Sequence, residues 1–499
     1  MSQPDVPVEG SEHSSARTLV VGMMRKAVLW SALSFIFSNL SSIVIFLIIA
    51  AKVPPHVFGI IALSTIAADF VSMEGRYAAM DAIIQTGRFD KTSLRDAFTS
   101  FLGIVGVIAV GLIAFAPYES AAYNEPLLAT FMPLFGLMLL PIPWIAVMDA
   151  LMLRDLRYKQ TTQRSVAATL VGGAIGIAMA FSPWLIWALF AQRLTALVVQ
   201  TGLLYRFTRW LPGLSFRWAT AIDFVRRFLA LWLINTLVVS IGRVTLLVFG
   251  LRYDIVTVGL LRATNRITEA VQGPVIAPLQ GVWFPLMAKV KGNLEGEREV
   301  YNSIVRTATV VALPAFAGLA LVAPDLVSLI LPAQYAGVTP ILQASSITML
   351  LIPILWFNNV AMTSMGLNRL SLGYTLTLVG LSFVALYLSD HRTPPEAILI
   401  MAIPAAVVGL TGNILLNRRL KQPNFTYYAG LMPAVLATSV MSGLIALSNF
   451  LLAGWDAFPR FAISGAVGAG AYAGWLLAVH RAWLMDCLQI LRAQRSAPA

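Results

Sequence analysis

Charged side chains inside long apolar runs are the residues of this sequence best suited to chemistry. Asp69, Met73 and Arg76 are spaced at i, i+4 and i+7, which places them on one face of a helix. A charge at the centre of a membrane helix costs roughly 2.5–3.5 kcal/mol on insertion, so such a residue is expected to face a wet cavity or another charge. This face is therefore a candidate site.

A second apolar run repeats the arrangement. Arg262, Arg266 and Glu269 follow the same i, i+4, i+7 spacing, and Asn265 lies beside them. A guanidinium group binds phosphate oxygens through two parallel hydrogen bonds and stays protonated at any relevant pH. The arginines therefore suit an anionic, phosphate-bearing ligand, whereas Asp69 and Glu269 are candidates for taking up a coupling ion, either a proton or Na⁺.

Another apolar run contributes Asn235 and Arg243, which are eight residues apart and so roughly aligned on one helix face. Two interpretations of these buried polar residues stay open. In the first, the acids and arginines pair with each other and serve only to hold the helices together. In the second, they line a central cavity that has an excess of positive charge. Asp69 and Arg76 are too far apart for a direct pair along one helix, whereas Arg266 and Glu269 are within reach.

The sequence predicts neither a metal site nor a cofactor. Cys487 is the only cysteine, so an internal disulfide is excluded and a structural zinc site lacks ligands. The four histidines are far apart along the chain, which argues against a histidine-based catalytic site. They are His13, His56, His391 and His480.

The segments that carry these residues are long and apolar. Of the 499 residues, 58% are hydrophobic and only 12% are charged, which is too apolar for a soluble protein. Runs of about 20 apolar residues recur, each long enough to cross a bilayer core of about 30 Å. We predict an all-α integral membrane protein with about 14 transmembrane helices. The predicted spans are 28–50, 57–86, 98–117, 127–153, 165–181, 184–205, 228–250, 256–287, 303–323, 340–364, 371–388, 395–416, 428–451 and 459–480.

An internal duplication organises these spans. Residues 111–117 read GLIAFAP and residues 318–324 read GLALVAP, while Gly59 precedes Asp69 by ten residues as Gly259 precedes Glu269. Because each half has an even number of spans, the repeat predicts two six-helix lobes related by a pseudo-twofold axis along the membrane normal. The predicted divisions are a disordered cytoplasmic tail 1–27, an N-terminal lobe 28–205, a cytoplasmic linker 206–227, a C-terminal lobe 228–416, two additional transmembrane helices 417–485 and a cytoplasmic tail 486–499.

The connections between spans carry little that resembles a catalytic domain. The linker 206–227 is expected to be either an amphipathic stretch on the inner leaflet or a solvated connection. The outward connections are short, including Pro117–Pro126 and its longer counterpart Pro324–Pro340. Prolines within the predicted spans 127–153, 256–287 and 340–364 are expected to kink those helices. Without a large outer loop, the sequence does not predict an enzyme.

The basic residues are distributed unequally between the two sides of the predicted bundle. The formal net charge is +12, and 26 of the 35 Lys and Arg residues fall on the side of the N-terminus, against 4 on the other side. This asymmetry predicts that both termini are cytoplasmic. Contact with anionic membrane lipids is a secondary consequence, and the distribution does not indicate nucleic-acid binding.

Several stretches resemble the bacterial polysaccharide flippases of the Wzx type. They are VFGIIAL from Val57, DAIIQ from Asp81, LRDLRYK from Leu153, VGLLRATNRI from Val258 and WFPLM from Trp283. The resemblance covers about residues 28–420. It implies the multidrug/oligosaccharidyl-lipid/polysaccharide exporter superfamily, whose members have two lobes and alternate between inward-open and outward-open states.

The resemblance also implies a function and a location. Flippases of this type move undecaprenyl-pyrophosphate-linked oligosaccharides from the inner to the outer leaflet of the bacterial inner membrane, for lipopolysaccharide or exopolysaccharide biosynthesis. The expected partners are the lipid-linked oligosaccharide and membrane lipids, together with polysaccharide polymerase and export machinery. By their positions in the spans, the expected substrate-binding residues are Arg76, Arg243, Arg262, Arg266, Asn265 and Asn235.

A multidrug or cation exporter of the same superfamily is the alternative. The cavity of such a transporter is expected to be acidic or aromatic, because its ligands are cations. Five arginines lie inside the predicted spans, which argues against this alternative. They are Arg76, Arg193, Arg243, Arg262 and Arg266.

Overall fold

All regular structure in the described part of the chain is helical, as predicted. The computed structural model describes residues 37, 39–155, 157–389, 391–481 and 483. The predicted tails 1–27 and 486–499 lie outside these residues. After a first helix, Asn39–Ala50, the elements of the N-terminal half are α2 (Pro55–Asp69), η1 (Phe70–Gly75), α3 (Arg76–Thr86), α4 (Lys91–Tyr123), α5 (Pro126–Leu137), α6 (Ile142–Arg154), α7 (Tyr158–Ala180), η2 (Leu185–Trp187) and α8 (Ala188–Thr208).

The second half follows a similar order. Its elements are α9 (Trp218–Arg252), α10 (Ile255–Val290), α11 (Leu294–Ile330), η3 (Ala333–Tyr335), α12 (Val338–Met349), α13 (Ile352–Ser364), α14 (Asn368–Leu388), α15 (Pro394–Arg419), α16 (Asn424–Ala429), α17 (Met432–Leu451) and α18 (Ala457–Val479). The predicted linker thus contains a stretch without helix, residues 209–217, after which α9 begins.

The membrane character of the chain is confirmed. Within the described residues, eight helices are long and apolar enough to cross a membrane, or up to ten if each of two bent helix pairs forms one span. Helices α7, α9 and α10, of 23, 35 and 36 residues, are not among these candidates. The figure of 14 spans and the division into two lobes therefore remain predictions.

Prolines break two of the predicted spans at corresponding places in the two halves. Helices α5 and α6 meet at 42°, and α12 and α13 meet at 47°. In contrast, α4 and α11 continue through Pro117 and Pro324 and end at Tyr123 and Ile330, so the predicted ends of these spans were wrong. A proline removes one hydrogen bond of the helical ladder, and the residues after it can keep theirs.

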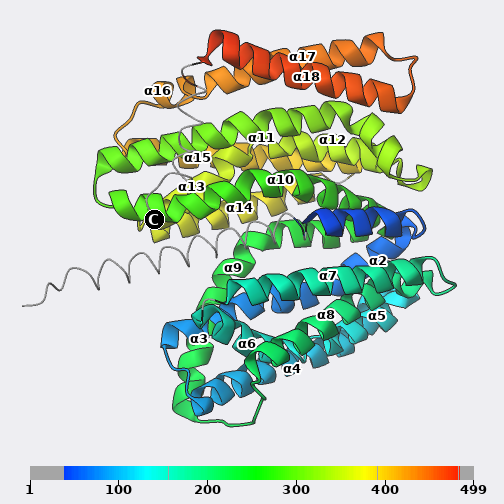
Figure 1. Ribbon diagram of the computed structural model, residues 1–499, viewed down its shortest axis with the longest axis vertical. Helices are drawn as coiled ribbons and strands as arrows, with labels where there is room; N and C mark the ends of the chain where they lie inside the picture. The colour runs from blue at the N-terminus through cyan, green and yellow to red at the C-terminus, as the bar shows by residue number, and fades with distance from the viewer. Residues whose placement is uncertain (1–36, 38, 156, 390, 482, 484–499) are drawn as a thin grey trace, which may run out of the picture.

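Buried apolar side chains form two clusters that follow the two halves of the sequence. One cluster is drawn mostly from α2–α6 and α9. The other is drawn mostly from α10–α13 and also includes buried residues between positions 45 and 58. Figure 1 shows α3–α8 in the lower half of the view and α10–α15 in the upper half, with α17 and α18 at the upper end. Helix α9 packs against α3 and α4 but also against α10 and α14, so it contacts both groups of helices.

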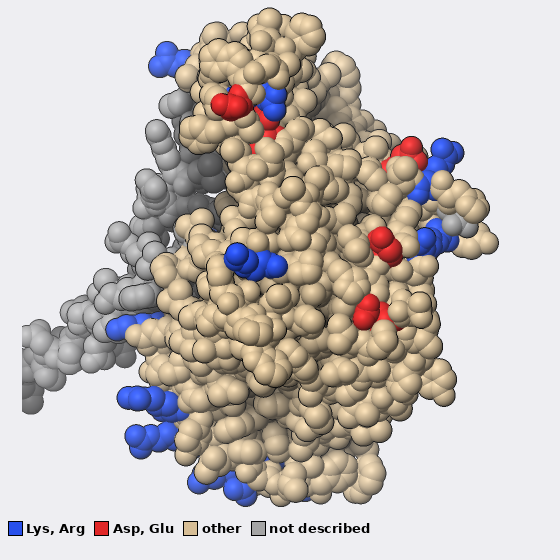
Figure 2. Space-filling view, turned by 90° about the vertical axis from the view of Figure 1, so that its right-hand side faces the viewer, with Lys and Arg blue, Asp and Glu red and all other residues tan. Residues whose placement is uncertain are grey.

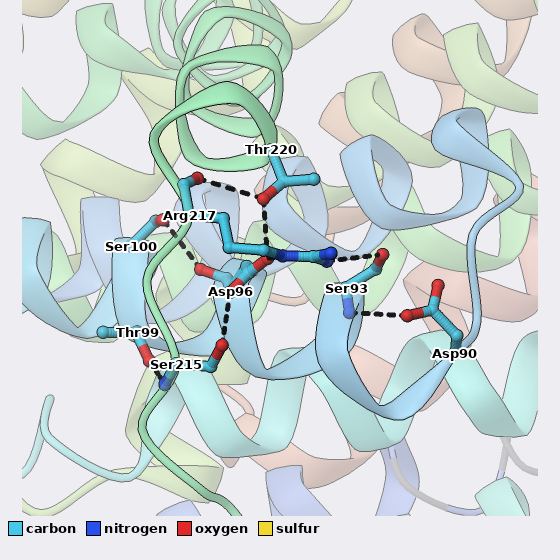
Figure 3. A network of polar contacts seen from close by, with 8 residues as sticks. All are labelled: Asp90, Ser93, Asp96, Thr99, Ser100, Ser215, Arg217 and Thr220. Carbon is cyan, nitrogen blue, oxygen red and sulfur yellow. Dashed lines mark hydrogen bonds and ion pairs between the residues drawn. The ribbon is translucent and has the colours of Figure 1, made fainter.

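The non-helical segment 209–217 is held against α4 by a buried carboxylate (Figure 3). Asp96 is 1% exposed and accepts hydrogen bonds from Ser215 Oγ at 2.8 Å, Arg217 Nε at 2.7 Å and Thr220 Oγ1 at 2.6 Å. The backbone N–H of Ser215 also donates to Thr99 Oγ1 at 3.2 Å. Because these donors satisfy a carboxylate that burial would otherwise penalise, they fix the start of α9 on α4.

Polar contacts attach the α17–α18 pair to α11. The guanidinium of Arg460 on α18 binds both carboxylate oxygens of Asp325, with Nε at 2.9 and 3.0 Å. Asn449 Nδ2 on α17 donates to Leu321 O at 3.0 Å, and Tyr472 Oη on α18 donates to Val310 O at 2.7 Å. These contacts are spread along α11, so they hold the α17–α18 pair against it at several positions.

Replacing Arg460 with alanine is expected to lower the stability of the protein by about 3 kcal/mol, because Asp325 would remain buried without its partner. The measurement is thermal unfolding of the purified protein in detergent. Arg419→Ala, which removes an exposed arginine at the end of α15, is the control and should leave the melting temperature unchanged. Equal melting temperatures for Arg460→Ala and the wild type would contradict this prediction.

One end of the bundle carries few charges. Figure 2 looks onto the ends of the helices where the α7–η2, η3 and α17–α18 connections lie, and that face is mostly uncharged, with small separate groups of basic and acidic residues. This end is the predicted outer side, to which the sequence analysis assigns only 4 of the 35 Lys and Arg residues.

Candidate functional site

The helices that carry the two predicted charged faces cross each other at their repeat-related glycines. A Cβ atom added to Gly59 of α2 would lie 2.0 Å from the carbonyl oxygen of Ile255, and one added to Gly259 of α10 would lie 1.8 Å from that of Pro55. The contact is therefore reciprocal, with each glycine against the first residue of the other helix. Only glycine allows two backbones to approach this closely.

Past this crossing, the span that begins with α2 changes its helical geometry. A π-helical segment, η1, occupies Phe70–Gly75 between α2 and α3. Its i→i+5 hydrogen bonds place more residues in each turn than an α-helix does. Asp69 and Arg76 stand on either side of this segment, so the prediction that both lie on one face was wrong, and they point to different neighbours.

Asp69 pairs with an arginine of α8. Arg193 Nη1 lies 3.1 Å from Asp69 Oδ1, and both side chains are partly exposed. The sequence placed Arg193 inside a span but did not assign it to the site. Its position in an otherwise apolar helix was the available signal.

Arg76 turns toward α6 instead. Arg76 Nη1 lies 3.8 Å from Asp149 Oδ2, and the other oxygen of Asp149 binds Arg164 of α7. Two arginines thus share one buried carboxylate and leave an excess positive charge. The Nε atoms of Arg76 and Arg164 are buried and have no hydrogen-bond acceptor among the described residues. Sequence reasoning missed Asp149, the only acid in the apolar helix α6.

Arg243 of α9 is engaged with the π-helical segment. Its Nη2 lies 3.0 Å from Glu74 Oε2, and its guanidinium stands over the ring of Phe70 at 4.4 Å. This pair is neutral and mostly buried, which corresponds to the pairing interpretation rather than to a free cation. Asn235, the other predicted residue of α9, has a side chain outside the described part of the structure.

On α10, two of the predicted charges pair with each other. Arg266 Nη1 lies 3.4 Å from Glu269 Oε2, as the i,i+3 spacing allowed, and Glu269 is about half exposed. Asn265 is partly buried beside them. This pair is loose and accessible, because its separation is at the long end for a charged hydrogen bond.

Arg262 differs from the other predicted arginines. Among the described residues it has no carboxylate within ion-pair distance, although its side chain is partly buried. The charges of Asp69, Arg193, Arg266 and Glu269 all act on it, so the five side chains form one electrostatic group that spans α2, α8 and α10. Three guanidinium groups and two carboxylates leave this group, which we name the Arg262 cluster, with one excess positive charge.

The Arg262 cluster has the charge and the hydrogen-bond donors that suit an anion. An arginine without a carboxylate partner still has its hydrogen-bond donors available, and the guanidinium fork matches the spacing of phosphate oxygens. Four of the five members of the cluster lie on α2 and α10, the helices that cross at Gly59 and Gly259, and Asp69 and Glu269 each follow the glycine of their helix by ten residues. Separation of α2 and α10 would therefore change the surroundings of the cluster directly.

Comparison with known proteins finds a family model and curated relatives that are named for polysaccharide biosynthesis. The family model described as "Polysaccharide biosynthesis protein" matches residues 48–340. The succinoglycan biosynthesis transport protein ExoT of Rhizobium meliloti is 22% identical over 59% of this chain and 60% of its own length. The lipopolysaccharide biosynthesis protein WzxC of Escherichia coli is 23% identical over 63% of this chain and 64% of its own. The chain therefore spans under two thirds of these curated relatives.

Solved structures share the fold. The lipid II flippase MurJ in an inward closed conformation has a TM-score of 0.76, with 13% identity over 92% of this chain and 100% of that one. An inward-facing multidrug transporter of the MATE family has a TM-score of 0.56, with 14% identity over 79% of this chain and 98% of that one. The family match extends over more than half of the sequence and bears out the resemblance noted in the residues. The chain belongs to the polysaccharide biosynthesis protein family.

Proposed function

We propose that this protein is a flippase that moves an undecaprenyl-pyrophosphate-linked oligosaccharide from the inner to the outer leaflet of the bacterial inner membrane. Family membership, the names of the two curated relatives and the shared fold support a transporter in polysaccharide biosynthesis. The observation that carries the chemical part of the proposal is the excess positive charge of the Arg262 cluster. The flipped product would pass to polysaccharide polymerase and export machinery.

The pyrophosphate is the part of such a substrate that the cluster would recognise. Arg262 would bind phosphate oxygens directly, and Arg266, only loosely held by Glu269, would supply further donors. Asn265 would contact the sugars, and so would Asn235. Arg76 and Arg243 are already engaged with carboxylates, so their contribution requires those pairs to open during transport. The polyprenyl tail would remain in the lipid.

Transport would proceed by alternating access between two six-helix lobes, 28–205 and 228–416, with both termini in the cytoplasm. In this orientation α2 and α10 begin on the outer side, so the Gly59–Gly259 crossing closes the outer end. The cluster lies farther toward the cytoplasm along both helices. Opening to the outside would then require this crossing to separate.

The membrane potential can drive this transport. An anion that moves outward runs with an inside-negative potential, and each charge gains about 2.3 kcal/mol per 100 mV. A dianionic pyrophosphate gains roughly twice that amount. Obligatory coupling to an ion is therefore not needed on energetic grounds.

Neutralising the two coupling-ion candidates, Asp69→Asn and Glu269→Gln, is accordingly expected to slow transport without abolishing it. Each change frees an arginine, Arg193 or Arg266, and strengthens the cationic character of the site. The measurement is the rate at which surface polysaccharide reappears after induced expression. Complete loss in both variants at normal protein levels would show instead that coupling is obligatory.

Deletion of the gene tests the proposed function. A flippase predicts that surface polysaccharide is lost while lipid-linked oligosaccharide accumulates on the cytoplasmic side, where an added glycan-modifying enzyme cannot reach it in intact cells. A multidrug or cation exporter predicts normal polysaccharide and increased accumulation of cationic dyes. The arginine-rich cluster does not favour that alternative, since its charge repels cations.

A further inference from the structure

One turn of α4 carries a buried acid that has no role either in the transport cycle proposed above or in the contacts that hold the helices together. Glu119 lies on α4, is 6% exposed and has no hydrogen-bond or ion-pair partner among the described residues. It belongs to a buried face of α4 that also includes Leu112 and Ala116. Every other buried carboxylate discussed above, Asp96, Asp149 and Asp325, has one or more basic partners.

Glu119 lies one turn before Tyr123, a residue that stands beside the crossing of α2 and α10. One turn farther along α4, Tyr123 donates a hydrogen bond to Leu247 O of α9 at 2.9 Å. A Cβ added to Gly250 of α9 would meet the Tyr123 ring at 2.6 Å, Val258 at 3.2 Å and Leu63 at 3.3 Å. Four helices, α2, α4, α9 and α10, therefore meet at Tyr123, next to Gly259 and one turn from Gly59.

Several other titratable groups near this end of the bundle have partners of their own. His56 Nε2, at the start of α2, lies 2.9 Å from Glu125 Oε2, which precedes α5. Arg252, at the end of α9, donates to Leu386 O, and Asp254 caps α10 by accepting from Thr257 N at 2.6 Å. Tyr123, one turn from Glu119 on α4, is close enough for the Glu119 charge to act on its hydroxyl.

We propose that Glu119 is a proton-binding site that controls the outer closure. A carboxylate without donors costs far more free energy to bury than a neutral carboxylic acid, so the closed arrangement favours the protonated side chain. When α2 and α10 separate, water reaches this end of α4 and the proton can leave. Protonation therefore favours the closed crossing, and loss of the proton favours the open one, which makes the closed population fall as the outer pH rises.

This inference rests on the proposed function only for its place in a transport cycle. It can be tested on the conformation alone, with no transported substrate. The single native cysteine, Cys487, can be replaced by serine, and cysteines for spin labels introduced as Ala122→Cys and Gln334→Cys, both exposed at the same end of the bundle. The distance between the labels in lipid nanodiscs would be measured from pH 5 to pH 9.

We expect the wild-type background to show one short distance at low pH and a growing longer distance as the pH rises. Glutamine has the shape of a protonated glutamate and cannot ionise, so Glu119→Gln should show the short distance at every pH. The matched control is Glu125→Gln, which removes an acid that is engaged with His56, and its response should follow the wild type.

Three outcomes would overturn the proposal. They are a distance that does not respond to pH in the wild-type background, a pH response that survives in Glu119→Gln, and a response that disappears in Glu125→Gln while Glu119→Gln keeps it. The last of these would assign the proton to the His56–Glu125 pair. A normal conformational response in a protein that fails to flip lipid-linked oligosaccharide would leave this inference intact and refute the proposed function instead.

Discussion

Replacing Gly259 with alanine is expected to reduce surface polysaccharide by about tenfold or more, since a cost of only 1.4 kcal/mol to the closed state changes its population tenfold. The new methyl carbon would stand 1.8 Å from the carbonyl oxygen of Pro55. Backbone atoms cannot yield as a flexible side chain does, so the two helices must move apart. The closed outer crossing is then lost, although both helices can still form.

The reciprocal change gives an independent test of the same contact. In Gly59→Ala the added carbon would stand 2.0 Å from Ile255 O, so a similar loss is expected. Combining both substitutions should do little more than either alone, because the contact has already been broken and neighbouring changes are not additive. Gly380→Ala in α14 is the matched control, since no atom lies within 4 Å of its added carbon.

Surface polysaccharide and the distance between the labels at Ala122 and Gln334 should change together in these variants. The labels should move apart in Gly59→Ala and in Gly259→Ala and stay in place in Gly380→Ala. Wild-type polysaccharide together with an unchanged distance in Gly259→Ala would show that the crossing does not need glycine, and the role given to it would be wrong.

The long helices were predictable because membrane insertion leaves a strong local signal. A run of about 20 apolar residues specifies a span whatever surrounds it. Prolines at corresponding places in the two halves, Pro141 and Pro353, mark the two breaks, because each lies at the start of the helix that follows the break. At Pro117 and Pro324 the sequence predicted helix ends, but α4 and α11 continue through both prolines. The sequence alone does not distinguish a proline that ends a helix from one that is tolerated inside it.

Four of the five members of the Arg262 cluster were singled out from the sequence, whereas Arg193 and the pairing of the side chains were not. Charge within an apolar run identified Asp69, Arg262 and Glu269, and the internal repeat indicated that Gly59 and Gly259 correspond. The partners depend on tertiary packing. A π-helical segment between Asp69 and Arg76 cannot be read from spacing, and it sends these side chains to α8 and α6.

Neutralising Arg262 separates a binding role from a structural one. A hydrogen bond to a charged group contributes about 1.5–3 kcal/mol, so Arg262→Gln is expected to slow flipping by roughly ten- to a hundredfold. The same change should leave stability unaffected or slightly increased, because no carboxylate among the described residues loses a partner. Arg262→Lys keeps the charge but loses the two parallel donors of the guanidinium group, so its rate of flipping should lie between that of Arg262→Gln and that of the wild type.

Arg243→Gln provides the contrasting case. It would leave Glu74 mostly buried without its partner, so this variant should lose about 3 kcal/mol of stability, and its transport defect should follow the amount of folded protein. Flipping per folded molecule in proteoliposomes, measured beside thermal unfolding, distinguishes the two arginines. If Arg262→Gln flips at the wild-type rate, or loses activity only in proportion to stability, then the arginines serve to hold helices together and the anion is bound elsewhere.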